Sequence, residues 1–191
     1  GRERLLSCVG VSVDDWNFPA YAMEVINSGS QQIDIMELFR DWFGMLNRGY
    51  HLTPVGSSDS HDVSRYIVGQ GRTYVKVGDK SPERIDTDAA VESFQAGKVL
   101  VSLGLMAKIS IDNKYGPGDL VSGSNVALVA VEVHGPAWTS ADRVSLYANG
   151  KKIREEKIPP ASIPGLKWKG KWEIPVPSHD LFLVAIAEGP G

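Results

Sequence analysis

The sequence contains a single cysteine, Cys8, in 191 residues. One cysteine excludes an internal disulfide and any zinc site built from several thiolates. It is compatible with a cytoplasmic or an exported protein, because large exported proteins can also lack disulfides. The chain therefore does not belong to the small disulfide-stapled proteins.

Long apolar runs and an excess of positive charge are also missing. No apolar run reaches the roughly 18 residues that a membrane-spanning helix needs. The formal net charge is −3, whereas nucleic-acid-binding proteins usually carry a basic excess. Hydrophobic residues make up 42% and charged residues 23% of the chain, which is ordinary for a globular protein. We therefore expect a globular protein with neither a membrane span nor a nucleic-acid partner.

The stretch from Val55 to His61, with the sequence VGSSDSH, is the main candidate for a site. It reads as the end of a buried strand followed by a small-residue turn. Asp59 and His61 are two positions apart, so a strand running into a tight loop can present both on one side. Carboxylate and imidazole are ligands that suit zinc, manganese or iron. An Asp-x-His pair also occurs in ordinary loops, with the histidine simply solvated, so both interpretations stay open here.

The segment before this stretch predicts a helix over residues 31–48. Apolar residues at helical spacing cover a broad face, and Asn47-Arg48-Gly49 favours a helix end. Helix, turn and strand then form an αβ unit, and in α/β folds chemistry gathers at the carboxyl ends of the strands. We therefore expect Asp59 and His61 at a reactive edge.

Three further residues are weaker candidates for lining the same pocket. Glu24 lies inside the apolar run of residues 22–27, and acids are rarely buried without a partner. Asn27 ends that run, and Arg72 follows two glycines at the start of another predicted strand. Each of the three also has a purely structural interpretation.

The second half of the chain reads as short strands separated by turns, without helices. Asn149-Gly150 is the strongest hairpin signal and favours a type I′ turn. This pattern predicts a small antiparallel, immunoglobulin-like β-sandwich over residues 106–191, after a first region of residues 1–105. An alternative function follows from it: a carbohydrate-binding or adhesion module, with Trp138, Trp168 and Trp172 as stacking platforms. Core packing is the other interpretation of these tryptophans.

Several segments together resemble the carbaryl-hydrolase-like branch of the PHP (polymerase and histidinol phosphatase) superfamily of metal-dependent hydrolases. The resemblance covers about residues 22 to 150, and the Ser-Asp-Ser-His element is its most specific part. The segments that carry it are Asn47-Arg48-Gly49-Tyr50, Val55-Gly56-Ser57-Ser58-Asp59-Ser60-His61, Gly71-Arg72-Thr73-Tyr74-Val75, residues 96–104 and Gly118-Asp119-Leu120-Val121.

This resemblance implies the carboxyl-terminal part of a distorted (β/α)₇ barrel, followed by the β-sandwich. It also implies divalent metal ions (zinc, manganese or iron) and hydrolysis of phosphoester, ester or carbamate bonds in a small-molecule substrate. By the same resemblance, Asp59 and His61 match the final metal-binding motif, with the carboxylate on one ion and the imidazole on a neighbouring one. A metal-activated water is then the nucleophile.

The chain departs from the family at its other metal ligands. The family's opening His-x-His pair is absent, and the only histidines are His51, His61, His134 and His179. Two protein ligands cannot hold a multinuclear centre. We therefore expect either the carboxyl-terminal part of a larger enzyme, inactive by itself, or a relative that has lost its metal.

Overall fold

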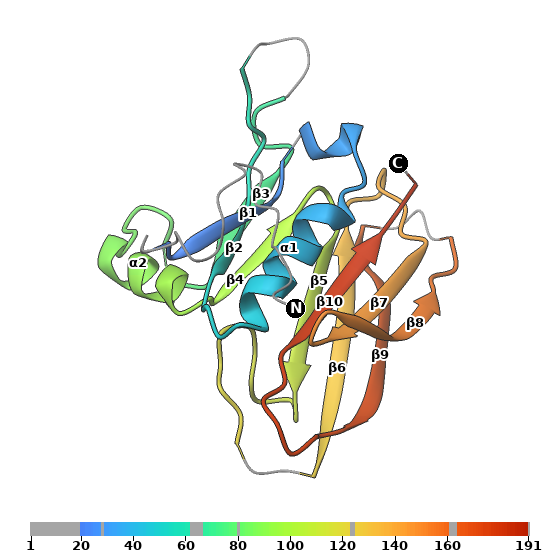
Figure 1. Cartoon of the computed structure of the whole chain (residues 1–191). Helices are drawn as coiled ribbons and strands as arrows, with labels where there is room; N and C mark the ends of the chain where they lie inside the picture. The colour runs from blue at the N-terminus through green and yellow to red at the C-terminus, as the bar shows by residue number, and fades with distance from the viewer. Residues whose placement is uncertain are drawn as a thin grey trace.

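The computed structural model of the chain describes residues 20–27, 29–61, 67–79, 81–122, 125–160 and 164–190, so Cys8 lies outside it. Strands dominate the described residues, and most of them belong to the second half of the chain (Figure 1). In chain order the elements are β1 (Ala22–Ile26), the 3₁₀ helix η2 (Gly29–Gln32), α1 (Met36–Leu46), β2 (Thr53–Gly56), β3 (Arg72–Val75), α2 (Thr87–Gln95), β4 (Val99–Ser102), β5 (Met106–Ile111), β6 (Val126–Gly135), β7 (Arg143–Ala148), β8 (Lys151–Lys157), β9 (Gly165–Pro175) and β10 (Leu183–Glu188).

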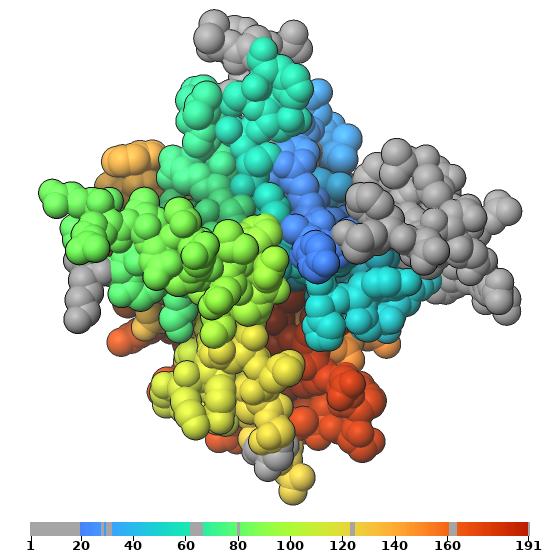
Figure 2. Space-filling model, turned by 90° about the vertical axis from the view of Figure 1, so that its left-hand side faces the viewer, coloured from blue at the N-terminus to red at the C-terminus, as the bar shows by residue number. Residues whose placement is uncertain are grey.

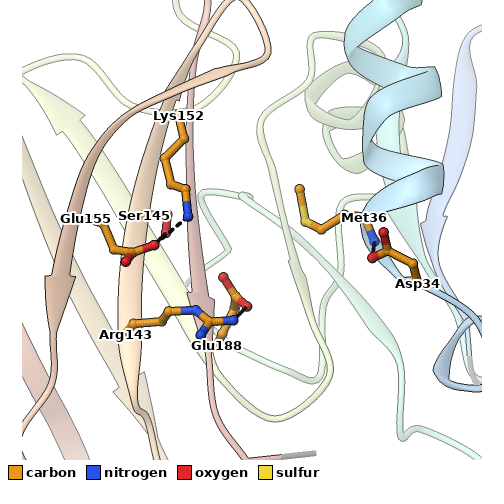
Figure 3. Close-up of polar contacts among 7 residues, drawn as sticks. All are labelled: Asp34, Met36, Arg143, Ser145, Lys152, Glu155 and Glu188. Carbon is orange, nitrogen blue, oxygen red and sulfur yellow. Dashed lines mark hydrogen bonds and ion pairs between the residues drawn. The ribbon is translucent and has the colours of Figure 1, made fainter.

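The helix α1 begins later than the predicted residue 31. The Oδ1 of Asp34 accepts a hydrogen bond of 3.0 Å from the backbone N–H of Met36, as the close-up in Figure 3 shows. This bond satisfies one of the N–H groups that lack a partner at a helix start. The apolar pattern extends beyond the helix because η2 precedes it as a separate turn.

Strand β1, helix α1 and strand β2 form one βαβ unit. Its two strands pair in parallel, with Glu24 opposite Val55 and Ile26 opposite Gly56. The Nε1–H of Trp42 donates to the Leu52 carbonyl over 2.8 Å, which fastens the helix to the start of β2. The αβ unit predicted before Asp59 and His61 is therefore present.

The next unit is an antiparallel hairpin, β3–β4, with α2 in its connection. The helix α2 begins at Thr87, where the Oδ1 of Asp86 accepts a 3.0 Å hydrogen bond from the Ala89 N–H as an N-cap. The hydroxyl of Thr53 donates to the Phe94 carbonyl over 2.8 Å, so the end of α2 is held against β2. Neither helix within the described ranges is long and apolar enough to cross a membrane.

Two three-stranded antiparallel sheets, ordered β10-β7-β8 and β5-β6-β9, make up the second half of the chain. Alternate residues of their strands point inward, which is the spacing that β-geometry requires. They enclose a mostly aliphatic core, here called the sheet core: Ala127, Val129, Val131, Val133, Ala141, Val144, Leu146, Ile158 and Ile174.

The Asn149-Gly150 turn joins β7 to β8 as predicted. Ala148 pairs with Lys151, and the turn residues have φ angles of 47° and 80°. Positive φ at both central positions is the requirement of a type I′ turn, which Asn and Gly meet at little steric cost.

A second core lies around α1 and is called the helix core: Val25, Phe39, Trp42, Phe43, Met45, Leu52 and Tyr147. Residues of β10 pack against it, including Val184 and Ile186. The Phe43 ring centroid lies 5.6 Å from that of Tyr147 and 5.9 Å from that of Phe182. Figure 1 shows α1 lying across the sheet that contains β10. The helix core therefore contains side chains from both sides of residue 105.

The expected fold class is wrong. No (β/α)₇ barrel is seen in the described residues, which form four small sheets, mostly of antiparallel strands. Each unit of such a barrel needs a parallel strand followed by a helix. Only β1 and β2 form a parallel pair among the named strands, and the helix α2 connects two antiparallel strands. The sequence pattern indicated one αβ unit, but it did not determine what the following strands pair with.

Beside the helix core, the outer face of the β10-β7-β8 sheet carries two ion pairs, drawn in Figure 3. Arg143 pairs with Glu188 and Lys152 with Glu155, each with an N···O distance of 2.5 Å. The Lys152 ammonium donates to the Glu155 carboxylate and lowers the pKa of that acid. In each pair the positive charge of the basic side chain is balanced by the carboxylate beside it, so these residues do not indicate a site for a charged ligand.

Candidate functional site

The carboxyl ends of β1 and β2 meet at one edge of the molecule, which Figure 1 shows away from the β10-β7-β8 sheet. The backbone N–H of Ser57, the first residue after β2, donates to the Ile26 carbonyl over 2.9 Å. A β-carbon added at Gly71 would lie 2.1 Å from the Ser57 carbonyl oxygen, so the entry to β3 passes close to this point. The carboxyl ends of β1 and β2 and the entry to β3 therefore lie side by side.

The structure brings Glu24 and Asn27 together, and Ser57 joins them. The Asn27 amide donates to Glu24 Oε2 over 2.9 Å, and the Ser57 hydroxyl donates to Glu24 Oε1. Glu24 is exposed, whereas its neighbour Val25 is completely buried. The two hydrogen bonds hold the carboxylate at the strand ends, where it can accept further bonds through its remaining lone pairs.

Asp59 and His61 contact each other within the loop after β2. The His61 Nδ1 lies 2.7 Å from the Asp59 carbonyl oxygen and 3.5 Å from Asp59 Oδ1. Asp59 has a φ of 46°, a left-handed conformation that Asp tolerates better than most residues. The side chain of Asp59 is 47% exposed and that of His61 is 75% exposed, so both are open to a ligand from solvent.

This contact determines which ring nitrogen of His61 is available. A carbonyl oxygen can only accept a hydrogen bond, so the Nδ1 must carry the hydrogen in this pair. In the neutral ring the Nε2 is then the nitrogen with a free lone pair. Histidines that bind metals commonly donate their other N–H to a carbonyl or carboxylate in this way. The local geometry of His61 therefore fits a metal ligand.

Arg72 has a different set of contacts. Its Nε–H donates to the Gly69 carbonyl, and its Nη1 lies 3.3 Å from the Tyr74 hydroxyl. These bonds tie the guanidinium to its own hairpin rather than to Asp59 or His61. Arg72 therefore stabilises the entry to β3, and its exposed side chain lies near the strand ends without pairing with the acids of the site.

The described residues do not form a complete metal site. No group of three or more His, Cys, Asp or Glu side chains placed to hold an ion occurs within the ranges that the structure describes. A catalytic zinc site takes three protein ligands. Asp59 and His61 have suitable chemistry, but a metal centre needs donors beyond these two.

The tryptophans of the alternative function lie in two kinds of environment. Trp168 and Trp172 stack with ring centroids 5.5 Å apart, and both pack against the sheet core. Trp138 is 87% exposed. Of these three tryptophans, Trp138 is therefore the one that is exposed enough to stack on a sugar.

Comparison of the chain with models of protein families, with curated proteins and with solved structures finds no match in any of the three. The geometry of the site is therefore the basis for any functional conclusion.

Sequence reasoning missed two features of polar chemistry. The bond from Ser57 to Glu24 was signalled by an acid inside an apolar strand, which requires a partner. A second feature is a set of lysines at alternate or facing strand positions, including Lys169 and Lys171 on β9. Residues two apart on a strand share a face, so the sequence could have placed these two lysines together, but it does not show which other strands face them.

Proposed function

We propose that this chain is part of a metal-dependent hydrolase and contributes Asp59 and His61 to its metal centre. The observation that carries the proposal is the contact of the His61 Nδ1 with the Asp59 carbonyl, 2.7 Å long. It leaves Nε2 as the lone-pair nitrogen of an exposed imidazole, beside an exposed carboxylate.

The position of this pair supports the proposal. Both residues follow β2 at the carboxyl ends of the parallel pair β1–β2, the edge at which α/β folds place ligands. Glu24 lies at the same edge, already oriented by Ser57 and Asn27. The remaining donors come from outside the described residues.

The substrate class follows from the same proposal. Divalent zinc, manganese or iron, when bound, supplies an activated water and polarises a substrate oxygen. The bonds that suit this chemistry are phosphoester, ester and carbamate bonds in a small molecule. Within the chain, Asp59 and His61 bind the cation.

Calorimetric titration of the chain with Zn²⁺ and with Mn²⁺ tests this role. We expect His61→Ala and Asp59→Asn each to weaken binding by at least about tenfold. His179→Ala is a matched control, since His179 is also exposed and its Nδ1 lies 2.9 Å from a backbone carbonyl. Equal losses in the His61 and His179 variants would contradict the proposal.

The carbohydrate-binding alternative depends on Trp138, the exposed tryptophan after β6. It predicts that Trp138→Ala abolishes binding to an oligosaccharide, while metal binding is absent. Binding to oligosaccharide arrays, measured for the chain and for the Trp138 variant, separates this alternative from the hydrolase.

A further inference from the structure

A cavity of about 980 Å³ lies between the β3–β4 hairpin and the outer face of the β5-β6-β9 sheet. Among the described residues that line it, six are lysines and none is an arginine: Lys76, Lys98, Lys108, Lys114, Lys169 and Lys171. We call it the lysine groove. The groove adjoins the carboxyl end of β3, whereas Arg72 begins that strand. It is therefore separate from the loop of Asp59 and His61.

The first wall of the groove is one face of the β3–β4 hairpin. Tyr74 pairs with Leu100, and the Lys76 N–H donates to the Lys98 carbonyl over 2.9 Å two positions further on. These four residues share one face, because alternate residues of a strand point the same way. A tyrosine ring and two lysines therefore line this wall.

The second wall is the outer face of the β5-β6-β9 sheet. Lys108 pairs with Glu132, and Glu132 pairs with Lys169, so the acid has a lysine on either side. Lys171 follows on the same face of β9. Hydrophobic residues of these strands point into the sheet core on the other side. The lysine side chains are therefore directed outward.

The loop after β5 closes one end of the groove. Lys114 lies 4.8 Å above the centre of the Tyr115 ring, and both residues line the cavity. Within this loop the Asp119 Oδ2 accepts a 2.9 Å hydrogen bond from the Gly116 N–H, and its Oδ1 lies 4.0 Å from the Lys98 ammonium. On the face in Figure 2, the segment after β5 (yellow) lies against the part of the chain around β3, α2 and β4 (green).

The charges of the groove are poorly neutralised. Among the described residues, no carboxylate lies within ion-pair distance of Lys76, Lys108, Lys114, Lys169 or Lys171. Glu132, the one acid among the described residues that line the cavity, contacts His134 over 3.1 Å. Like charges gathered on neighbouring strands are destabilising. A chain with a net charge of −3 nevertheless concentrates these lysines in one hollow.

We propose that the lysine groove binds a small molecule that carries several phosphate groups. The lysine ammonium is a compact point charge that binds phosphate without the bidentate geometry of arginine. Several lysines spread over the groove therefore suit a ligand with several phosphate groups better than a ligand with one carboxylate. The cavity volume is that of a small-molecule site. The negative net charge of the chain disfavours a long nucleic acid, which would extend beyond the groove.

Calorimetric titration with inorganic tripolyphosphate and with orthophosphate, at low and at physiological salt, tests the proposal. We expect one tripolyphosphate to bind per chain, at least about tenfold more tightly than orthophosphate. Lys108→Ala/Lys169→Ala removes two groove lysines and should weaken tripolyphosphate binding by at least about tenfold. Lys151→Ala/Lys157→Ala makes the same charge change on the exposed strand β8 and should alter binding less than about twofold.

Circular dichroism is used to check that each variant is folded. If the alanine double variant does not fold, Lys108→Gln/Lys169→Gln replaces it. Equal losses in the two double variants would overturn the proposal, because binding would then follow net charge alone. Equal affinity for orthophosphate and tripolyphosphate would overturn it as well. Tighter groove binding of hexaglutamate than of tripolyphosphate would show that the occupant is an acidic peptide instead.

Discussion

The two cores of the molecule differ in two respects. They have different compositions, and they join residues that lie at different separations along the sequence. The sheet core is mostly aliphatic and lies between strands of residues 126–174. The helix core is mostly aromatic, and it joins α1 and β1 to Tyr147, with Phe182 packed against it. Alternating aliphatic residues build a layer from neighbouring hairpins, whereas large rings connect a distant helix to that layer. The helix core therefore attaches the edge that carries Asp59 and His61 to the rest of the molecule.

The largest expected effect comes from removing the ring at the centre of the helix core. Phe43 is 3% exposed and contacts the rings of Trp42, Tyr147 and Phe182. We expect Phe43→Ala to lower the free energy of unfolding by about 3–5 kcal/mol, measured by guanidinium denaturation. Phe43→Leu should retain much of that stability. A loss below about 1 kcal/mol for the alanine variant would mean that the rings contribute little.

A cavity in the sheet core should have a comparable or smaller effect. Leu146 is completely buried among aliphatic side chains. Leu146→Ala should lower the free energy of unfolding by about 2–5 kcal/mol. If the two cores form one cooperative unit, tryptophan fluorescence and far-ultraviolet circular dichroism should report the same midpoint in this variant. Two separate transitions would show that the cores unfold independently.

The hydrogen bond between α1 and β2 has a smaller expected effect. Trp42→Phe keeps an aromatic ring but removes the N–H that bonds to the Leu52 carbonyl. The buried carbonyl loses its partner, so we expect a loss of about 1–3 kcal/mol. Trp172→Phe is the comparison in the sheet core, since Trp172 lies half-buried there. A larger loss in the Trp172 variant would contradict this account of α1.

The smallest expected effect concerns alkaline pH. Burial raises the pKa of the Tyr147 hydroxyl above its ordinary value. The folded state then holds this proton more tightly than the unfolded state does, so the resulting stability is present below about pH 10 and is lost as the pH rises further. Between about pH 9 and 11 the stability of the wild type should therefore fall more steeply than that of Tyr147→Phe. Parallel slopes in denaturation experiments would contradict this cause.

Local signals in the sequence predicted much of the secondary structure. The Asn149-Gly150 turn, the cap at Asp86 and the alternation of Val129, Val131 and Val133 are properties of short segments. Each depends on backbone conformation or on the period of a strand. These features could therefore be predicted without knowing the fold.

The arrangement of the strands could not be predicted in the same way. The resemblance implied a barrel, but β3 and β4 pair antiparallel, and β10 pairs with β7 across the sequence. Pairing of this kind depends on tertiary packing rather than on the pattern of any one strand. The lysine groove depends on it too, because its two walls come from separate sheets.

For the candidate site, the sequence predicted which residues lie together better than it predicted their partners. Asp59 and His61 contact each other, as their spacing suggested, and Glu24 bonds to Asn27, for which spacing was no guide. The contacts of Arg72 with Gly69 and Tyr74 depend on the course of the β2–β3 connection, which spacing alone does not determine.

The central claim is that Asp59 and His61 act together on a metal ion, and proton NMR of the four histidine rings tests it most directly. The chain contains His51, His61, His134 and His179, so once the ring signals are assigned, His179 serves as an internal reference in the same sample. At low Mn²⁺ concentration the account predicts that the His61 signal broadens first, and that Asp59→Asn removes this preference. Equal broadening of His61 and His179, with no effect of the Asp59 substitution, would contradict it.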